Sequence, residues 1–170
     1  MPTQELIGEV EAALRGAIES KAPFQSALEL IAGAFEARTT TLHYADSKTR
    51  FLFLVADTGL PDGLRAVTTK IPYGKGMAGI CVERKDVVSV CNLQTDSSGV
   101  AKPGAKETRV AGAIVVPVFA CDGFEVVGTL GIGKSEEHEY SEAEKALIAE
   151  CAKTLGPALE TWAGKGCPGL

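Results

Sequence analysis

The sequence predicts an α+β domain, in which a central antiparallel sheet of about six strands is flanked by N- and C-terminal helices. Three observations predict it: apolar residues recur at helical spacing before the first β-rich segment, short turns join the β-rich segments, and a capping-box sequence begins a long last helix. Adjacent hairpins favour antiparallel pairing, and the helices must then cover the sheet.

The expected elements follow one another without an internal repeat. Apolar spacing predicts a first helix over 4–19, and Pro23 is a typical first-turn residue for a second helix that reaches Phe35. β-branched and aromatic residues predict the strands. The strands are expected at 39–44, 50–56, 67–71, 87–90, 112–119 and 124–133.

Two more helices and one long loop complete the pattern. A short helix over 77–84 follows a glycine-rich turn, and the last helix begins at Ser141 and is expected to kink at Gly156-Pro157. The segment 94–109 lacks periodicity and is rich in Ser, Gly, Lys and Pro, which predicts a loop of the length that functional lids have. The organisation predicted is an N-terminal amphipathic helix over 1–20, a domain over 21–163 and a flexible tail over 164–170.

Composition excludes several classes of protein. The net charge of −5 argues against nucleic-acid and membrane-surface partners, which select for clustered Lys and Arg. No apolar run approaches the ~20 residues that span a bilayer, and the acidic N-terminal segment is neither a signal nor a transit peptide. Five widely spaced cysteines without a CxxC pair, and only two histidines, predict reduced thiols and no metal site. We therefore expect a cytoplasmic protein with no cofactor.

Five pieces of the sequence, in this order and spacing, resemble the GAF domain family. They are Gly74–Gly79, Asp86–Val88 with Asn92-Leu93, Gly112–Val118, Val127–Ile132 and Tyr140–Glu144. Over 24–71 the resemblance rests on element order alone. It implies a stand-alone GAF domain with a PAS-like sheet and a ligand pocket between one sheet face and the short helix with its following loop. It also implies a role as a sensor in signal transduction with an unknown signalling partner, but no particular ligand, because one fold hosts many functions.

Strand alternation gives an independent indication of a pocket. Val127, Thr129, Gly131 and Gly133 share one strand face, and the two glycines leave that face bare. Glycine inside a strand is tolerated where a ligand or another backbone comes close. A ligand pocket and close packing of the 77–84 helix both explain this pattern.

The start of the short helix adds a hypothesis about the ligand. Its first N–H groups lack intrahelical acceptors and lie at the positive end of the helix dipole, although a tight turn explains the glycines equally well. Arg109 offers a planar donor group for a carboxylate or phosphate. The ligand is therefore expected to be a small anion or a neutral molecule. The candidate ligand-binding residues are Met77, Ala78, Gly79, Cys81, Cys91, Arg109, Ala113, Thr129 and Gly131, and no catalytic residue is predicted.

One alternative is an atypical thiol redox enzyme related to the free methionine-(R)-sulfoxide reductases. The resemblance implies a catalytic cysteine where this chain has Ala78, a second cysteine in the loop 94–109, which has none, and substrate-binding carboxylates at positions 113, 131 and 133. Cys81 and Cys91 remain as candidate thiols, although small core residues are the commoner role. His43 is expected to be a core residue, with haem ligation left open, and His138 lies in a charged loop.

A second alternative is a ligand-free dimerisation module. The stripes Leu6–Ile18 and Leu147–Trp162 are both apolar, and one sheet face does not obviously cover both. They predict a homodimer through the terminal helices, unless each helix covers the sheet within one chain.

Overall fold

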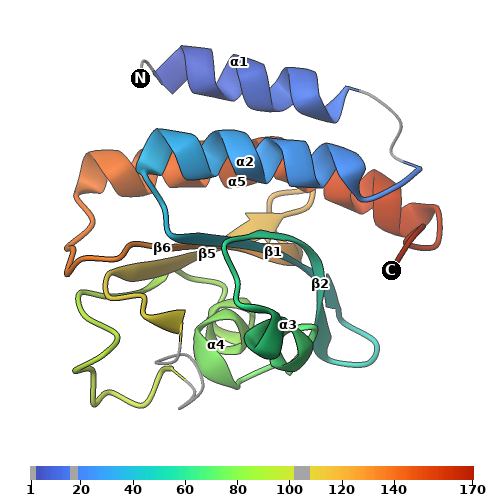
Figure 1. Cartoon of the computed structure of the whole chain (residues 1–170). Coiled ribbons are helices and arrows are strands. Elements are labelled where there is room, and N and C mark those ends of the chain that lie inside the picture. Colours follow the sequence, from blue (N-terminus) through green and yellow to red (C-terminus); the bar gives the residue numbers. More distant parts are fainter. Residues whose placement is uncertain (1–2, 16–18, 102–107) are drawn as a thin grey trace.

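A six-stranded antiparallel sheet forms the middle layer of the molecule (Figure 1). The computed structural model describes residues 3–15, 19–101 and 108–170. The strands lie in the order β3-β2-β1-β6-β5-β4. They are β1 (Thr39–Asp46), β2 (Phe51–Thr58), β3 (Lys70–Pro72), β4 (Val88–Val90), β5 (Ala113–Phe119) and β6 (Val126–Gly133). The helices are α1 (Thr3–Leu14), α2 (Ala22–Phe35), α3 (Asp62–Thr68), α4 (Gly76–Arg84) and α5 (Glu142–Gly164). The predicted α+β class is confirmed.

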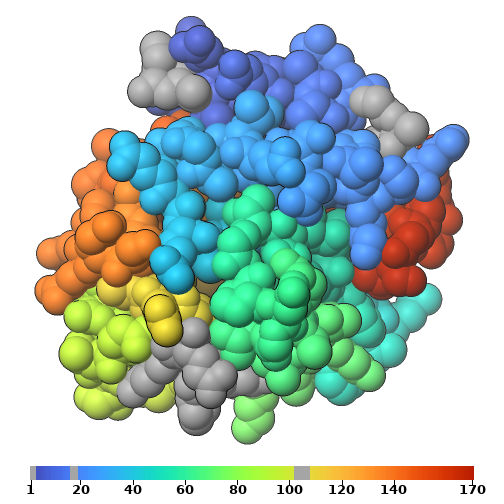
Figure 2. Space-filling view, viewed as in Figure 1, coloured from blue at the N-terminus to red at the C-terminus, as the bar shows by residue number. Residues whose placement is uncertain are grey.

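Three helices lie on one side of the sheet. α2 and α5 pack directly on it, and α1 lies across both of them (Figure 1). The space-filling view shows α1 along α2 at one end of the molecule (Figure 2). Trp162, near the C-terminal end of α5, is fully buried in this core, with its ring edge-on to the rings of Phe24 and Tyr44 at centroid distances of 5.8 Å and 6.0 Å.

The apolar stripes of the terminal helices are covered within one chain. Leu6, Val10 and Leu14 of α1 are buried against the second and last helices, and Leu155 and Leu159 of α5 are fully buried. The expectation of a homodimer rested on these stripes being unpartnered, and that reason does not hold. Residues 16–18, the end of the predicted first helix, lie outside the described residues.

The capping box at the start of α5 is present as the sequence predicts. The Ser141 hydroxyl accepts a hydrogen bond from the Glu144 N–H at 3.1 Å, and the Glu144 carboxylate accepts one from the Ser141 N–H at 2.8 Å. The helix continues through Pro157 without a break, and the kink expected at Gly156-Pro157 stays a prediction. After Gly164 the chain forms turns, in which the Trp162 Nε1–H donates to the Pro168 carbonyl at 3.1 Å.

On the other side of the sheet, one expected strand begins later than predicted and a short helix that was not predicted precedes it. Residues 67–71 were expected to be a strand because Val67 and the following threonines are β-branched, but Val67 belongs to α3 and β3 begins only at Lys70. Asp62 in the first turn suits a helix start, since it lies at the positive end of the dipole. Arg65 then anchors the helix, because its guanidinium donates to both carboxylate oxygens of Asp57 at 3.0 Å. Local contacts therefore outweigh the β-propensity.

None of the helices in the described part of the chain is both long and apolar enough to cross a membrane.

Candidate ligand-binding site

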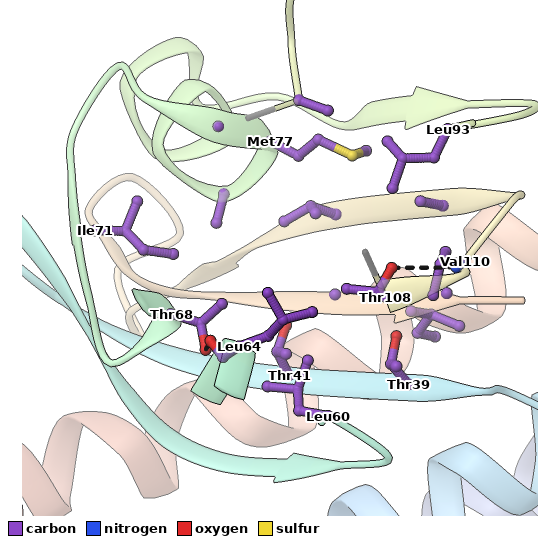
Figure 3. Close-up of a pocket in the computed structure, with 18 of the residues that line it drawn as sticks. Thr39, Thr41, Leu60, Leu64, Thr68, Ile71, Met77, Leu93, Thr108 and Val110 are labelled. Atoms are coloured by element: carbon purple, nitrogen blue, oxygen red, sulfur yellow. Dashed lines mark hydrogen bonds between the residues drawn. The ribbon is translucent and has the colours of Figure 1, made fainter. Parts of the chain in front are cut away.

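A cavity of about 460 Å³ lies between the second face of the sheet and the cover formed by α3, α4 and the segment that follows β4 (Figure 3). Strands β1, β5 and β6 form its floor. Its lining comprises Thr39, Thr41, His43, Leu60, Leu64, Val67, Thr68, Ile71, Gly76, Met77, Ala78, Leu93, Ala101, Thr108, Val110, Ala113, Ile114, Val115, Gly131, Ile132 and Gly133. The cavity is of the size that small-molecule sites have in proteins, ~300–1,000 Å³.

The floor combines threonines of β1 with glycines of β6. Thr39 is paired with Gly133 and Thr41 with Gly131, so each hydroxyl side chain stands beside a residue without a side chain. A methyl group on Gly131 would lie 2.6 Å from the Thr41 Oγ1, and one on Gly133 would lie 2.7 Å from the Thr39 Oγ1. The space above the glycines is therefore partly filled by the two hydroxyls.

The cover of the cavity is apolar. Leu64 on α3 and Met77 on α4 contribute large side chains, and Met77 extends toward Leu93, against which it packs (Figure 3). Close packing fixes the position of α4, because a methyl group on Gly79 would lie 2.5 Å from the Pro72 carbonyl oxygen. Gly79 itself is outside the lining, and its role is to let α4 approach β3.

No charged side chain contributes to the cavity among the described residues that line it. The polar ones are four threonines and His43, which is 2% exposed. The His43 Nε2 lies 2.9 Å from the Thr68 carbonyl oxygen, and since a carbonyl only accepts, this nitrogen carries the proton. Burial lowers the pKa of His43 to about 4, so its ring is neutral at pH 7 and ties β1 to the end of α3.

Two buried polar atoms have no partner in the described part of the chain. They are the Nδ1 of His43 and the Oγ1 of Thr129, which lie on paired residues of β1 and β6. Both atoms are enclosed, and Thr129 is outside the lining of the cavity. They therefore lie beside the cavity rather than at its surface.

The predicted site residues fall into two groups. Met77, Ala78, Ala113 and Gly131 line the cavity. Gly79, Cys81 and Thr129 are buried outside its lining, and Cys91 and Arg109 are exposed and also outside it. The idea that Arg109 adds a donor group to the pocket therefore has no support in this geometry.

No cysteine is among the described residues that line the cavity, although Cys81 packs against Met77, Ala78 and Val115, which do line it. Cys81 is fully buried, and burial raises the pKa of its thiol to about 12. The Cys81 Sγ lies 3.7 Å from the carbonyl oxygen of Val115, to which its S–H group donates. Such a thiol is a core residue rather than a nucleophile. In the described part of the chain there is also no cluster of three or more side chains that could hold a metal ion.

Sequence reasoning missed the residues that β1 and α3 bring to the cavity. Thr39, Thr41 and His43 occupy alternate positions of a predicted strand, and this period-two pattern is the signal that could have placed them on one face. Leu64 and Thr68 gave no such signal, because their helix was not predicted.

Comparison with known families identifies the chain. A sequence model described as "GAF domain" matches residues 21–160. The chain belongs to the GAF domain family. A search of curated proteins finds no match for this GAF domain.

Solved structures share the fold of this GAF domain at low sequence identity. The GAF domain of a phosphoenolpyruvate-protein phosphotransferase from Coxiella burnetii has a TM-score of 0.81 and 18% identity, with 96% of each chain covered. Free methionine-R-sulfoxide reductase from Neisseria meningitidis, in complex with its substrate, has a TM-score of 0.76 and 20% identity, with 96% of this chain and 91% of that chain covered. A putative GAF sensor protein from Burkholderia vietnamiensis has a TM-score of 0.71 and 16% identity, with coverages of 96% and 99%. The fold thus occurs in both sensors and enzymes, and the site must distinguish between them.

Proposed function

We propose that this GAF domain is a small-molecule sensor whose ligand is a neutral, largely apolar molecule held in the cavity beneath α3 and α4. The observation that carries the proposal is the lining, a space of about 460 Å³ with apolar side chains, threonines and a neutral histidine on the described walls. An ion placed there would lose its hydration without a counter-charge from these walls, and that loss costs several kcal/mol.

The proposal narrows the expected ligand from an anion or neutral molecule to a neutral one. The N-terminal residues Gly76, Met77 and Ala78 of α4 do line the cavity. A helix dipole contributes only ~0.3–1 kcal/mol toward an anion, or up to ~2 kcal/mol when partly buried. That contribution is smaller than the desolvation cost of a buried charge. Signalling through another protein remains part of the proposal, on the strength of the family resemblance.

A thiol redox reaction has weaker support. Ala78 stands in the cavity wall, and neither Cys81 nor Cys91 is among the residues that line it. Any enzymatic step at the cavity would therefore need a nucleophile other than these two thiols.

The test compares three molecules that share the indole ring and differ in charge: indole, indole-3-carboxylate and tryptamine. Indole is expected to raise the melting temperature in proportion to the logarithm of its concentration, because a ligand that binds only the folded state stabilises it. The two charged analogues are expected to have little effect. A native mass spectrum of the freshly purified chain would show whether a neutral molecule accompanies it.

A cavity-filling variant is the control. Ala113→Leu places a larger side chain in the cavity floor, so it is expected to abolish the indole response while the free variant still unfolds cooperatively. A rise in the melting temperature with indole-3-carboxylate alone would contradict the proposal of a neutral ligand and would indicate an anionic one. No response to any of the three, with nothing bound in the native spectrum, would favour the ligand-free dimerisation module.

A further inference from the structure

Two of the four threonines that line the cavity have hydroxyls with no hydrogen-bond partner among the described residues. Thr68 donates to the carbonyls of Leu64 and Arg65, and the Thr108 hydroxyl accepts from the Val110 N–H. Thr39 and Thr41 make no such bond, although Thr39 is only 8% exposed. Neither hydroxyl is among the enclosed atoms, so both are accessible from the cavity, where a polar group of a ligand can take the place of water as their hydrogen-bond partner.

The pair is arranged as a strip along the floor. Thr39 and Thr41 are two residues apart on β1, so their side chains point to the same side of the sheet at a spacing of ~6.6–6.8 Å. Both rise from β1 into the cavity (Figure 3). The bare positions of Gly133 and Gly131 on the neighbouring strand leave room for these hydroxyls, since a methyl group at either glycine would contact them.

The wall formed by α4 and the adjoining segments is apolar, in contrast to the hydroxyls of the floor. Met77 packs with Leu93 and Val110 in an apolar cluster. A molecule between this wall and the floor therefore meets hydroxyls along one edge and hydrocarbon elsewhere. A hydroxyl both donates and accepts hydrogen bonds, so it can pair with an uncharged oxygen or nitrogen group of either kind.

We infer that Thr39 and Thr41 form the recognition strip of the cavity, and that its ligand has an apolar body with a hydroxyl, carbonyl or amide group along one edge. This inference rests on the proposed function and adds the ligand class and the residues that select it. His43 is outside the strip, because its free Nδ1 is enclosed and its Nε2 is already bonded to Thr68.

The test uses two probes of nearly identical shape, 2-naphthol and 2-methylnaphthalene, which differ by a hydroxyl in place of a methyl group. Their dissociation constants are measured by equilibrium dialysis on the wild-type chain and on the double variant Thr39→Val/Thr41→Val. Valine keeps the shape and suits a strand. The double variant is expected to raise the dissociation constant of 2-naphthol about three- to tenfold, which corresponds to the loss of one hydrogen bond. The dissociation constant of 2-methylnaphthalene is expected to stay the same or to fall.

Thr129→Val is the matched control. It removes an unpartnered hydroxyl from the same face of the sheet, but that hydroxyl is outside the lining of the cavity. This variant should leave the ratio of the two dissociation constants unchanged. Gly131→Ala is an independent check, because its methyl group would displace the Thr41 hydroxyl without removing it, so this variant is expected to lower the preference for 2-naphthol.

The outcomes separate the two proposals. If neither probe binds the wild-type chain, the neutral cavity ligand itself is wrong. If both bind and the double variant keeps the wild-type ratio, the cavity binds apolar molecules but the threonine strip does not select them, and the inference is overturned. A loss of preference in Thr129→Val equal to that in the double variant would overturn it as well.

Discussion

The buried histidine makes the stability of this domain depend on mild acid. His43 is 2% exposed, its ring is bonded to the Thr68 carbonyl, and burial lowers its pKa to about 4. In the unfolded chain the ring takes up a proton near pH 6.5. Above pH 6.5 the ring is neutral in both states, and its contribution to stability is fully present.

Acid removes that contribution over a definite range. As the pH falls from 6.5 toward 4, the unfolded chain binds a proton that the folded chain does not, so the unfolded state is favoured. A difference of about 2.5 pKa units corresponds to ~3 kcal/mol, and at pH 4.5 most of it, ~2.5 kcal/mol, is already lost. This is a large share of the ~5–15 kcal/mol by which a domain is stable.

Urea denaturation at a series of pH values from 7.5 to 4.5 measures this effect. The wild-type chain is compared with His43→Gln, in which an amide N–H replaces the ring donor without titrating. Carboxylates titrate in both chains, so the difference between the two curves isolates His43. Parallel curves for the wild-type chain and His43→Gln over this range would refute the reasoning.

Two further predictions concern single packing contacts and a helix cap. Gly156→Ala on α5 is expected to cost about 1–3 kcal/mol in urea denaturation, because its methyl group would overlap the Phe119 carbonyl of β5. Gly8→Ala on α1, where nothing lies within 4 Å of the new methyl group, is expected to be neutral or to stabilise by up to ~1 kcal/mol, and equal costs for both would contradict the argument. Ser141→Ala is expected to cost ~1 kcal/mol by removing the cap of α5, and recovery in Ser141→Asp would identify the cap as the cause.

Local sequence patterns predicted most of the fold. The order of the strands along the chain and the capping box at Ser141 both follow from spacing of a few residues, and each agrees with the structure. α3 was missed because it is only seven residues long and contains the β-branched Val67. A helix this short is held by its anchors, here Arg65 on Asp57, and sequence spacing does not show such an anchor.

The cavity was predicted less completely, because its walls depend on pairing between distant segments. The glycines of β6 were recognised as a bare face, but sequence alone does not place β1 beside β6, with Thr41 opposite Gly131. The hydroxyls that fill that face therefore could not be foreseen. Cys91 and Arg109 were expected at the pocket because they flank a loop close to it in sequence, and loop side chains are not oriented by strand alternation.

Side chains of β1 point alternately to the two faces of the sheet, so neighbouring residues contribute to the cavity and to the helix-covered core in turn. Thr41 faces the cavity, whereas Leu42 is fully buried in the core beneath α2 and α5. A family member could therefore change the odd-numbered positions of this strand, and with them the chemistry of the cavity, while the even-numbered ones keep the helices in place. An insertion or deletion of one residue within the strand would exchange the core and cavity faces for every side chain beyond it, unless a β-bulge such as the register shift between β1 and β2 at Leu42 and His43 absorbed the change. We therefore expect members of the family to vary this cavity by substitution in β1 more readily than by changes in the length of the strand.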